Sequence, residues 1–127
     1  MVIQRPPMTS GFDTAFHTDN FKCAFITPAA QYAFGHVTQM KRHNDSDEVF
    51  VLLTGGAVLL TKDDNSVGLI TTRLLPKVAY NVTCGTWHYL AVTEEAVVFV
   101  AESGNMDSKN TESMDISGEN IHIDPVR

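Results

Sequence analysis

The stretch that decides the fold comprises residues 41–56, which read KRHNDSDEVFVLLTGG. Its residues 49–53 include no polar side chain, and an apolar run of this kind predicts a strand that is buried on both faces. Gly55 and Gly56 follow, and residues 57–60 (AVLL) resume the apolar pattern. Two apolar runs joined by a short glycine link are typical of a β-hairpin. We therefore expect a buried hairpin centred on the glycine pair.

A carboxylate, Glu48, stands at the entrance of this predicted strand, five residues after His43. Charged side chains are rarely buried unless they are paired. Glu48 is therefore either a functional group or a rim residue that faces water. His43 lies in a polar run, and it is either a site residue or part of an ordinary turn.

The chain outside this stretch also shows strand patterns. Further strands are predicted at residues 21–26, 32–41, 67–75, 79–82, 86–93 and 96–101. With the central pair, this makes about eight strands at a spacing of roughly 8–12 residues, and no helical periodicity is found before residue 102. The pattern indicates an all-β, antiparallel sandwich or barrel.

The chain divides into three parts by composition. Residues 1–20 carry scattered prolines and aromatic side chains, which predicts an extended N-terminal arm laid over the body. Residues 21–102 form the predicted barrel. Residues 103–127 make a polar tail, in which we expect loop or disorder over residues 103–120, because apolar groups are too few to bury. Residues 121–123 (IHI) are a candidate for a final edge strand.

Composition excludes several classes of partner. The chain has 127 residues, enough for one domain with a single core. The net charge is −6 and the basic residues are scattered, so we expect neither nucleic acid nor an anionic membrane as a partner. No apolar run is long enough to cross a membrane as a helix.

The expected compartment is the cytoplasm. The N-terminal residues lack the apolar core of a signal peptide. Cys23 and Cys84 are the two cysteines of the sequence, and they do not make a disulfide framework.

The central stretch resembles the first motif of the cupin superfamily, G-x5-H-x-H-x3,4-E-x6-G. Gly35, Lys41, His43, Glu48 and Gly55 stand at the motif positions, with lysine in place of the first histidine. The combined spacing of glycine, histidine, glutamate and glycine makes the resemblance specific for the fold.

A second segment, residues 80–88 (YNVTCGTWH), resembles the second cupin motif, whose core is P-x-G-x2-H. Gly85 and His88 match the motif in spacing. The departures are Thr83 for the usual proline, Val92 for the usual asparagine and Lys77 for the leading glycine.

The resemblance implies a cupin-like antiparallel jelly-roll β-barrel in which His43, Glu48 and His88 converge in the bore. Two imidazoles and one carboxylate suit a divalent metal (Zn, Fe, Mn or Ni) with open positions for water or substrate. For His88, the alternative is a core histidine that is hydrogen-bonded to the backbone. The superfamily includes enzymes of many classes, binding modules and storage proteins, so the fold does not name a function.

Lys41 opposes a metal in this site. The resemblance places it where the fourth ligand usually stands, and a protonated amine offers no lone pair. At ~6 Å from a divalent ion, with an effective dielectric of about 20, its charge would oppose binding by roughly 5 kcal/mol before solvent relaxation. We therefore expect a divalent metal that is weakly held or absent. The competing arrangement is a Lys41–Glu48 ion pair that fills the site.

Three functions remain open. The first is an enzyme that acts on a small polar metabolite, a sugar or a hydroxy or keto acid, with a metal and with Lys41 binding a substrate carboxylate or phosphate. The second is a metal-free isomerase or lyase, in which His43 or Glu48 transfers protons and Lys41 stabilises an enolate. The third is a non-catalytic ligand-binding or regulatory barrel, which an apolar bore without perturbed pKa values would favour.

The arm predicts self-association. Small barrels leave strand edges exposed, and these edges must be covered. The four phenylalanines at positions 12, 16, 21 and 25 give the N-terminal segment more aromatic surface than a free arm is expected to carry. We therefore expect a two-fold homodimer in which arms or edge strands pair between subunits.

Overall fold

The computed structural model describes residues 1–62, 68–107 and 109–116, and within them the protein consists of strands and one short 3-10 helix. No helix in these ranges is long and apolar enough to cross a membrane. The elements, in chain order, are β1 (Gly11–His17), β2 (Phe21–Thr27), η1 (Ala30–Tyr32), β3 (Gln39–His43), β4 (Glu48–Thr54), β5 (Ala57–Lys62), β6 (Ile70–Arg73), β7 (Ala79–Val82), β8 (Trp87–Val92), β9 (Val97–Ser103) and β10 (Thr111–Asp115).

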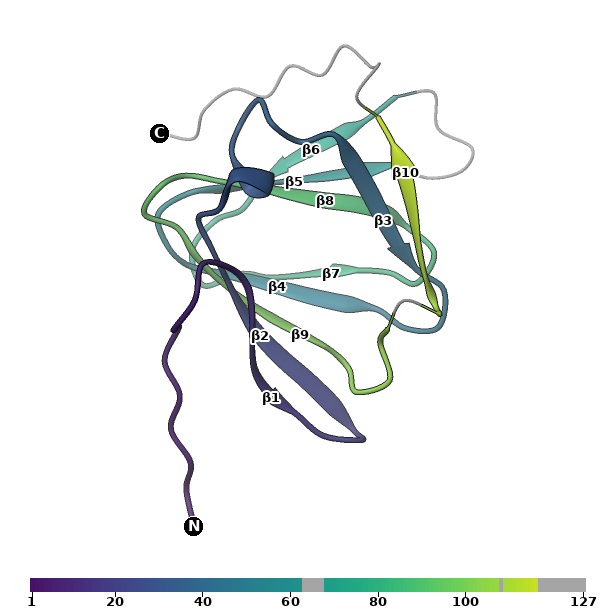
Figure 1. The fold of residues 1–127 in the computed structure, drawn as a ribbon. Coiled ribbons are helices and arrows are strands. Elements are labelled where there is room, and N and C mark those ends of the chain that lie inside the picture. The colour runs from purple at the N-terminus through teal and green to yellow at the C-terminus, as the bar shows by residue number, and fades with distance from the viewer. Residues whose placement is uncertain (63–67, 108, 117–127) are drawn as a thin grey trace.

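The strands form two facing antiparallel sheets of five strands each (Figure 1). The β4 sheet has the order β1-β2-β9-β4-β7, and the β8 sheet has the order β10-β3-β8-β5-β6. Consecutive strands often lie in different sheets, as expected for a jelly roll. The fold is therefore the predicted all-β cupin-like jelly roll, although its described strands make two separate sheets and not one closed barrel.

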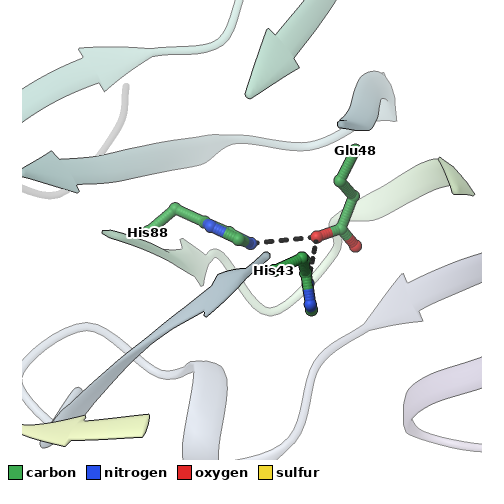
Figure 2. A group of neighbouring side chains, drawn as sticks. All are labelled: His43, Glu48 and His88. Carbon is green, nitrogen blue, oxygen red and sulfur yellow. Dashed lines mark hydrogen bonds and ion pairs between the residues drawn. The ribbon is translucent and has the colours of Figure 1, made fainter. Parts of the chain in front are cut away.

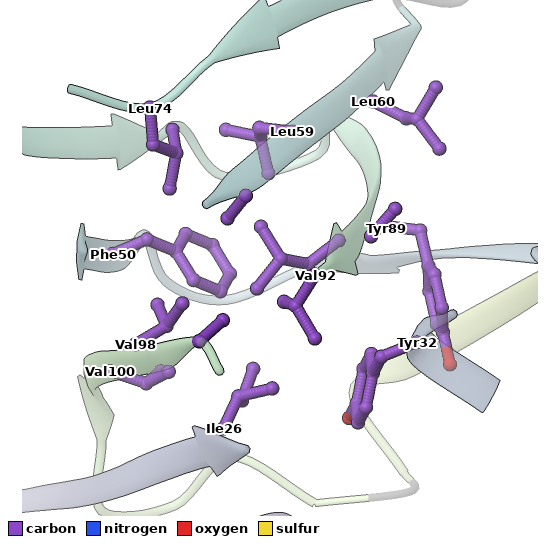
Figure 3. Close-up of a cluster of buried hydrophobic side chains, with 14 of the residues drawn as sticks. Ile26, Tyr32, Phe50, Leu59, Leu60, Leu74, Tyr89, Val92, Val98 and Val100 are labelled. Atoms are coloured by element: carbon purple, nitrogen blue, oxygen red, sulfur yellow. The ribbon is translucent and has the colours of Figure 1, made fainter. Parts of the chain in front are cut away.

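The core lies between the two sheets (Figure 3). The side chains predicted to be interior are all buried, and the register places Val98 inside, whereas Phe99 packs edge-on against Phe25. The buried members of the predicted set are Phe50, Leu52, Val58, Leu60 and Val98.

The predicted hairpin at the glycine pair is wrong. β4 is hydrogen-bonded to β7 and β9, whereas β5 is hydrogen-bonded to β6 and β8, so the link carries the chain from one sheet to the other. Gly55 has a φ of 72°, and a Cβ built there would lie 2.6 Å from the Cα of Ala96. Both strands are central in their sheets, which explains why both read as continuous apolar runs.

The predicted strand over residues 32–41 is also wrong in its first part. Residues 30–32 form η1, and β3 begins only at Gln39. Gly35 has a φ of 81°, a left-handed conformation that interrupts an extended strand.

The terminal parts hold more sheet than the sequence indicated. β1 lies within the predicted N-terminal arm and pairs with β2, and β10 lies within the predicted loop and pairs with β3. The expectation of loop or disorder is therefore wrong over Thr111–Asp115. Thr111 and Ser113 face a cavity and not the apolar core, so β10 carries no hydrophobic alternation. The candidate edge strand at residues 121–123 lies outside the described residues.

Candidate functional site

Three predicted site residues come together between the sheets (Figure 2). His43 ends β3, Glu48 begins β4, and His88 lies near the start of β8. The Oε1 atom of Glu48 lies 3.0 Å from Nε2 of His43 and 2.9 Å from Nε2 of His88. One ligand atom from each residue lies within 4.8 Å of the others. We call His43, Glu48 and His88 the triad, and its predicted convergence is confirmed.

The second nitrogen of each imidazole is also occupied. Nδ1 of His88 donates to the backbone carbonyl of Thr86 at 3.0 Å, because a carbonyl oxygen can only accept. In neutral His88 the lone pair is therefore on Nε2, and it points at the Glu48 carboxylate. Nδ1 of His43 lies 2.9 Å from the hydroxyl of Thr111, which can donate or accept. Two acceptors at 2.9 Å need a proton or a cation between them.

Glu48 is buried in this arrangement, with 4% of its surface exposed. The interpretation as a solvated rim residue is therefore wrong. Burial alone raises the pKa of the Glu48 carboxyl, but hydrogen bonds donated by His43 and His88 outweigh it and lower the pKa to about 2. Where the imidazoles do not donate, a bound cation would serve the same purpose.

The triad lies in the wall of a cavity of about 470 Å³, within the usual size range of small-molecule sites. Its polar and charged lining comprises Lys22, Gln31, Lys41, His43, Glu48, His88, Glu102, Asp107, Thr111 and Ser113. Its apolar and aromatic lining comprises Phe12, Ile26, Tyr32, Phe50, Tyr89, Leu90 and Met106.

Lys41 lines the same cavity, as predicted, but it does not fill the site. It is half-buried, and its Cα is the register partner of the His88 Cα across β3 and β8. Among the described residues, no ion pair joins its ammonium group to Glu48. The competing Lys41–Glu48 ion pair is therefore not formed.

Sequence reasoning missed a second buried carboxylate, Glu102. It lies opposite Glu48 in the register of β4 and β9, and 9% of its surface is exposed. Burial and then the charge of Glu48 raise its pKa to about 6, although Lys22, at 3.1 Å, opposes this shift. The alternation of Val98, Val100 and Glu102 would have indicated this position, had the register of β9 been known.

An aromatic wall flanks the polar groups. Tyr32 from η1 stacks on Tyr89 from β8, with ring centroids 5.5 Å apart and an interplanar angle of 21°. Burial, followed by the neighbouring Tyr89, raises the pKa of Tyr32 to about 12, so this hydroxyl stays protonated at neutral pH. The cavity thus combines a charged inner end with an aromatic side.

The triad fits a divalent metal by its donor set. Two imidazole nitrogens and one carboxylate oxygen are ordinary ligands for Zn, Fe, Mn and Ni. Thr86 and Thr111 hold the outer nitrogens, which is how metal-binding histidines are commonly oriented. Adjacent ligands of one ion at about 2.1 Å each lie roughly 3 Å apart, close to the separations found here.

No family model matches the sequence, and no curated protein matches it significantly. Several solved structures do match. CapF, the capsular polysaccharide assembling protein from Staphylococcus aureus, superposes with a TM-score of 0.58 at 14% identity, over 80% of this chain and 30% of that chain. The QdtA 3,4-ketoisomerase from Thermoanaerobacterium thermosaccharolyticum gives 0.56 at 19% identity, over 71% and 63%. Fe(II)-HppE gives 0.58 at 11% identity, over 81% and 60%.

These neighbours are cupin-fold proteins, and the present chain is a small cupin-like domain. It spans less than a third of the length of CapF and less than two thirds of QdtA and HppE. At such identities the likeness concerns the fold alone. Another structure with a similar superposition, Peruvianin-I, is described as a cysteine peptidase, so the neighbours do not share one activity.

Proposed function

We propose that this chain is an enzyme that holds a divalent metal with His43, Glu48 and His88 and acts on a small polar metabolite in the adjoining cavity. The observation that carries the proposal is the convergence of both Nε2 atoms on one buried oxygen of Glu48. When bound, the ion would act as a Lewis acid on a substrate oxygen. Glu48 offsets part of its charge, and Thr86 and Thr111 orient the two rings.

The substrate class we propose is a sugar or a hydroxy or keto acid. QdtA has been crystallised with TDP-4-keto-6-deoxyglucose, and HppE with Fe(II) and the substrate (S)-1-HPP. These ligands belong to those proteins, and they support the proposal only by showing what a cavity in this fold can hold. The mixed polar and aromatic lining of the present cavity suits a molecule of similar chemistry.

A metal-free isomerase or lyase is the second candidate. The separations of 2.9 and 3.0 Å also suit a proton held between imidazole and carboxylate. Lys41 on the same cavity wall favours this alternative, because its charge opposes a cation and would stabilise an enolate. In that case His88 transfers the proton, and Thr86 fixes its tautomer.

A non-catalytic binding barrel is the third candidate, and the cavity gives it the least support. Such a barrel would favour an apolar bore with ordinary pKa values. Here two carboxyls in the cavity, Glu48 and Glu102, have pKa values shifted in opposite directions. Separated pKa values of neighbouring carboxyls are more typical of catalytic sites.

Calorimetric titration of metal-stripped protein with Zn²⁺ and Mn²⁺ tests the proposal. We expect one ion per chain, with the affinity reduced by about a hundredfold or more in His88→Ala and Glu48→Gln, since both remove a ligand and not only an outer partner. His36→Ala is the matched control, because this histidine is exposed and lies outside the cavity lining. Wild-type protein that binds metal no more tightly than His88→Ala would instead favour the metal-free candidate.

A further inference from the structure

We propose that the ligand of the cavity is a small carboxylate, a hydroxy or keto acid and not a neutral sugar, and that its anionic end binds the ammonium group of Lys41. This inference rests on the proposed function for the ligand-binding role of the cavity. It narrows the substrate class to one of the two that were proposed.

The first observation is that Lys41 has no counter-ion. Within residues 1–62, 68–107 and 109–116, its side chain makes no hydrogen bond or ion pair. The other lysine of the cavity, Lys22, is held by Glu102 at 3.1 Å and donates to the carbonyl of Met106 at 3.2 Å. A half-buried ammonium group that lines a cavity without a partner is available for an anion.

The second observation is where Lys41 lies relative to the triad. Lys41 and His43 are two residues apart on β3, so their side chains lie on the same face of the strand. Lys41 is also the register partner of His88, and paired residues on antiparallel strands are close neighbours. A carboxylate at Lys41 therefore places an adjacent hydroxyl or keto oxygen beside the triad.

The third observation concerns the charge and shape of the ligand. The cavity lining contains no arginine, and no helix N-terminus is among the residues that line it, so a phosphate dianion would find one free cation where phosphate sites commonly provide several donors. One ammonium group matches one carboxylate. Tyr32 and Phe12 offer aromatic surface to the carbon skeleton.

The remaining acidic groups do not cancel this preference. Glu102 is paired with Lys22, Asp107 is exposed, and Glu48 faces the two imidazoles. A divalent ion at the triad would add further positive charge beside Lys41. The inner end of the cavity would then carry an excess of positive charge that a carboxylate offsets.

Lactate and lactamide form a pair of probes of nearly equal size that differ in charge. We expect Mn²⁺-loaded wild-type protein to bind lactate more tightly than lactamide or glucose, and Lys41→Met to lose the preference for lactate by about tenfold or more, because a charged hydrogen bond is removed. Lys77→Met, at an exposed lysine far along the chain from the cavity strands, should keep it.

The same substitution should strengthen Mn²⁺ binding, because the charge that opposes the ion is removed. Opposite effects on metal and on lactate separate a direct role of Lys41 from structural damage, which would weaken both. Lactate affinity that is unchanged in Lys41→Met, or no greater than that for lactamide, would overturn the inference. Inorganic phosphate that binds more tightly than lactate in a Lys41-dependent manner would overturn the carboxylate assignment.

Repeating the titrations with metal-free protein separates this inference from the proposed function. A preference for lactate that depends on Lys41, in protein that takes up no metal, would contradict the metal site and support the carboxylate site. Metal uptake by the triad without any such preference would do the reverse.

Discussion

Asp13 fastens the N-terminal segment to the body at the scale of a single residue. Its carboxylate accepts two hydrogen bonds from the guanidinium of Arg5, at 2.7 and 3.1 Å. It also accepts the backbone N–H groups of Met8 and Thr9, at 2.8 and 3.2 Å. The Arg5 hydrogen bonds, followed by the Met8 amide, lower the pKa of Asp13 well below its ordinary value of 3.8.

This contact should weaken in acid. Because the pKa of Asp13 is lower in the folded state, the unfolded state binds more protons below about pH 4, and the stabilisation is lost as pH falls. We expect hydrogen-exchange protection of the Met8 and Thr9 amides at neutral pH to decline below that value, and Asp13→Asn to show little protection at either pH. The buried Ala24 amide is the internal control. Equal protection in both proteins at neutral pH would contradict this role for Asp13.

The site residues differ in how far the sequence could predict them. His43, Glu48, His88 and Lys41 were identified because their spacing alone matched a motif. Glu102 was missed because its position in the cavity depends on the register of β9, which the sequence does not determine. Thr111 reaches His43 only through the pairing of β10 with β3, a contact between residues 68 positions apart.

At the scale of the element, the link between β4 and β5 is where the chain passes between the sheets. Gly55 combines a positive φ with a close approach to the backbone of Ala96. Gly85 has a similar φ of 83°, but a Cβ there would meet nothing within 4 Å. The two glycines thus separate backbone strain from steric overlap.

Substituting alanine at each glycine should give unequal losses of stability. Gly85→Ala should lower the free energy of unfolding by about 1 kcal/mol, from the strained φ alone. Gly55→Ala should lower it by about 3 kcal/mol or more, since its Cβ would also overlap backbone that cannot easily move. Urea unfolding of both variants measures the difference, and equal losses would show that the close approach at Gly55 has no energetic weight.

The strands themselves were largely predictable, but their partners were not. Apolar runs indicated β4, β5, β8 and β9 because these strands pack in the core. A glycine link serves a hairpin and a crossing between sheets equally well, so the local sequence could not distinguish them. β10 lacked an apolar signal because its inward residues line a polar cavity.

At the scale of the whole molecule, the N-terminal segment leaves apolar surface uncovered. Met1, Val2, Ile3 and Met8 are exposed, and they precede β1, which is an edge strand of its sheet. Figure 1 shows this segment extending away from the two sheets. An apolar segment beside an open strand edge is a common site of self-association.

We therefore expect a homodimer in which these segments or edges pair between subunits. Sedimentation velocity at micromolar concentration should show a dimer, and removal of residues 1–8 should shift it towards monomer, because the exposed apolar side chains are lost. A wild-type monomer at that concentration would contradict the prediction. Leu75→Ser, at an exposed apolar position elsewhere in the chain, is the control and should leave the dimer intact.

The metal content of purified, untagged protein tests the triad most directly. Elemental analysis should find sub-stoichiometric divalent metal in the wild type, less in His43→Ala, and close to one ion per chain in Lys41→His, which removes an opposing charge and adds a ligand. If the metal content of the wild type is the same in His43→Ala, the triad does not hold an ion. Metal that appears only in Lys41→His would show that the lysine has abolished the site.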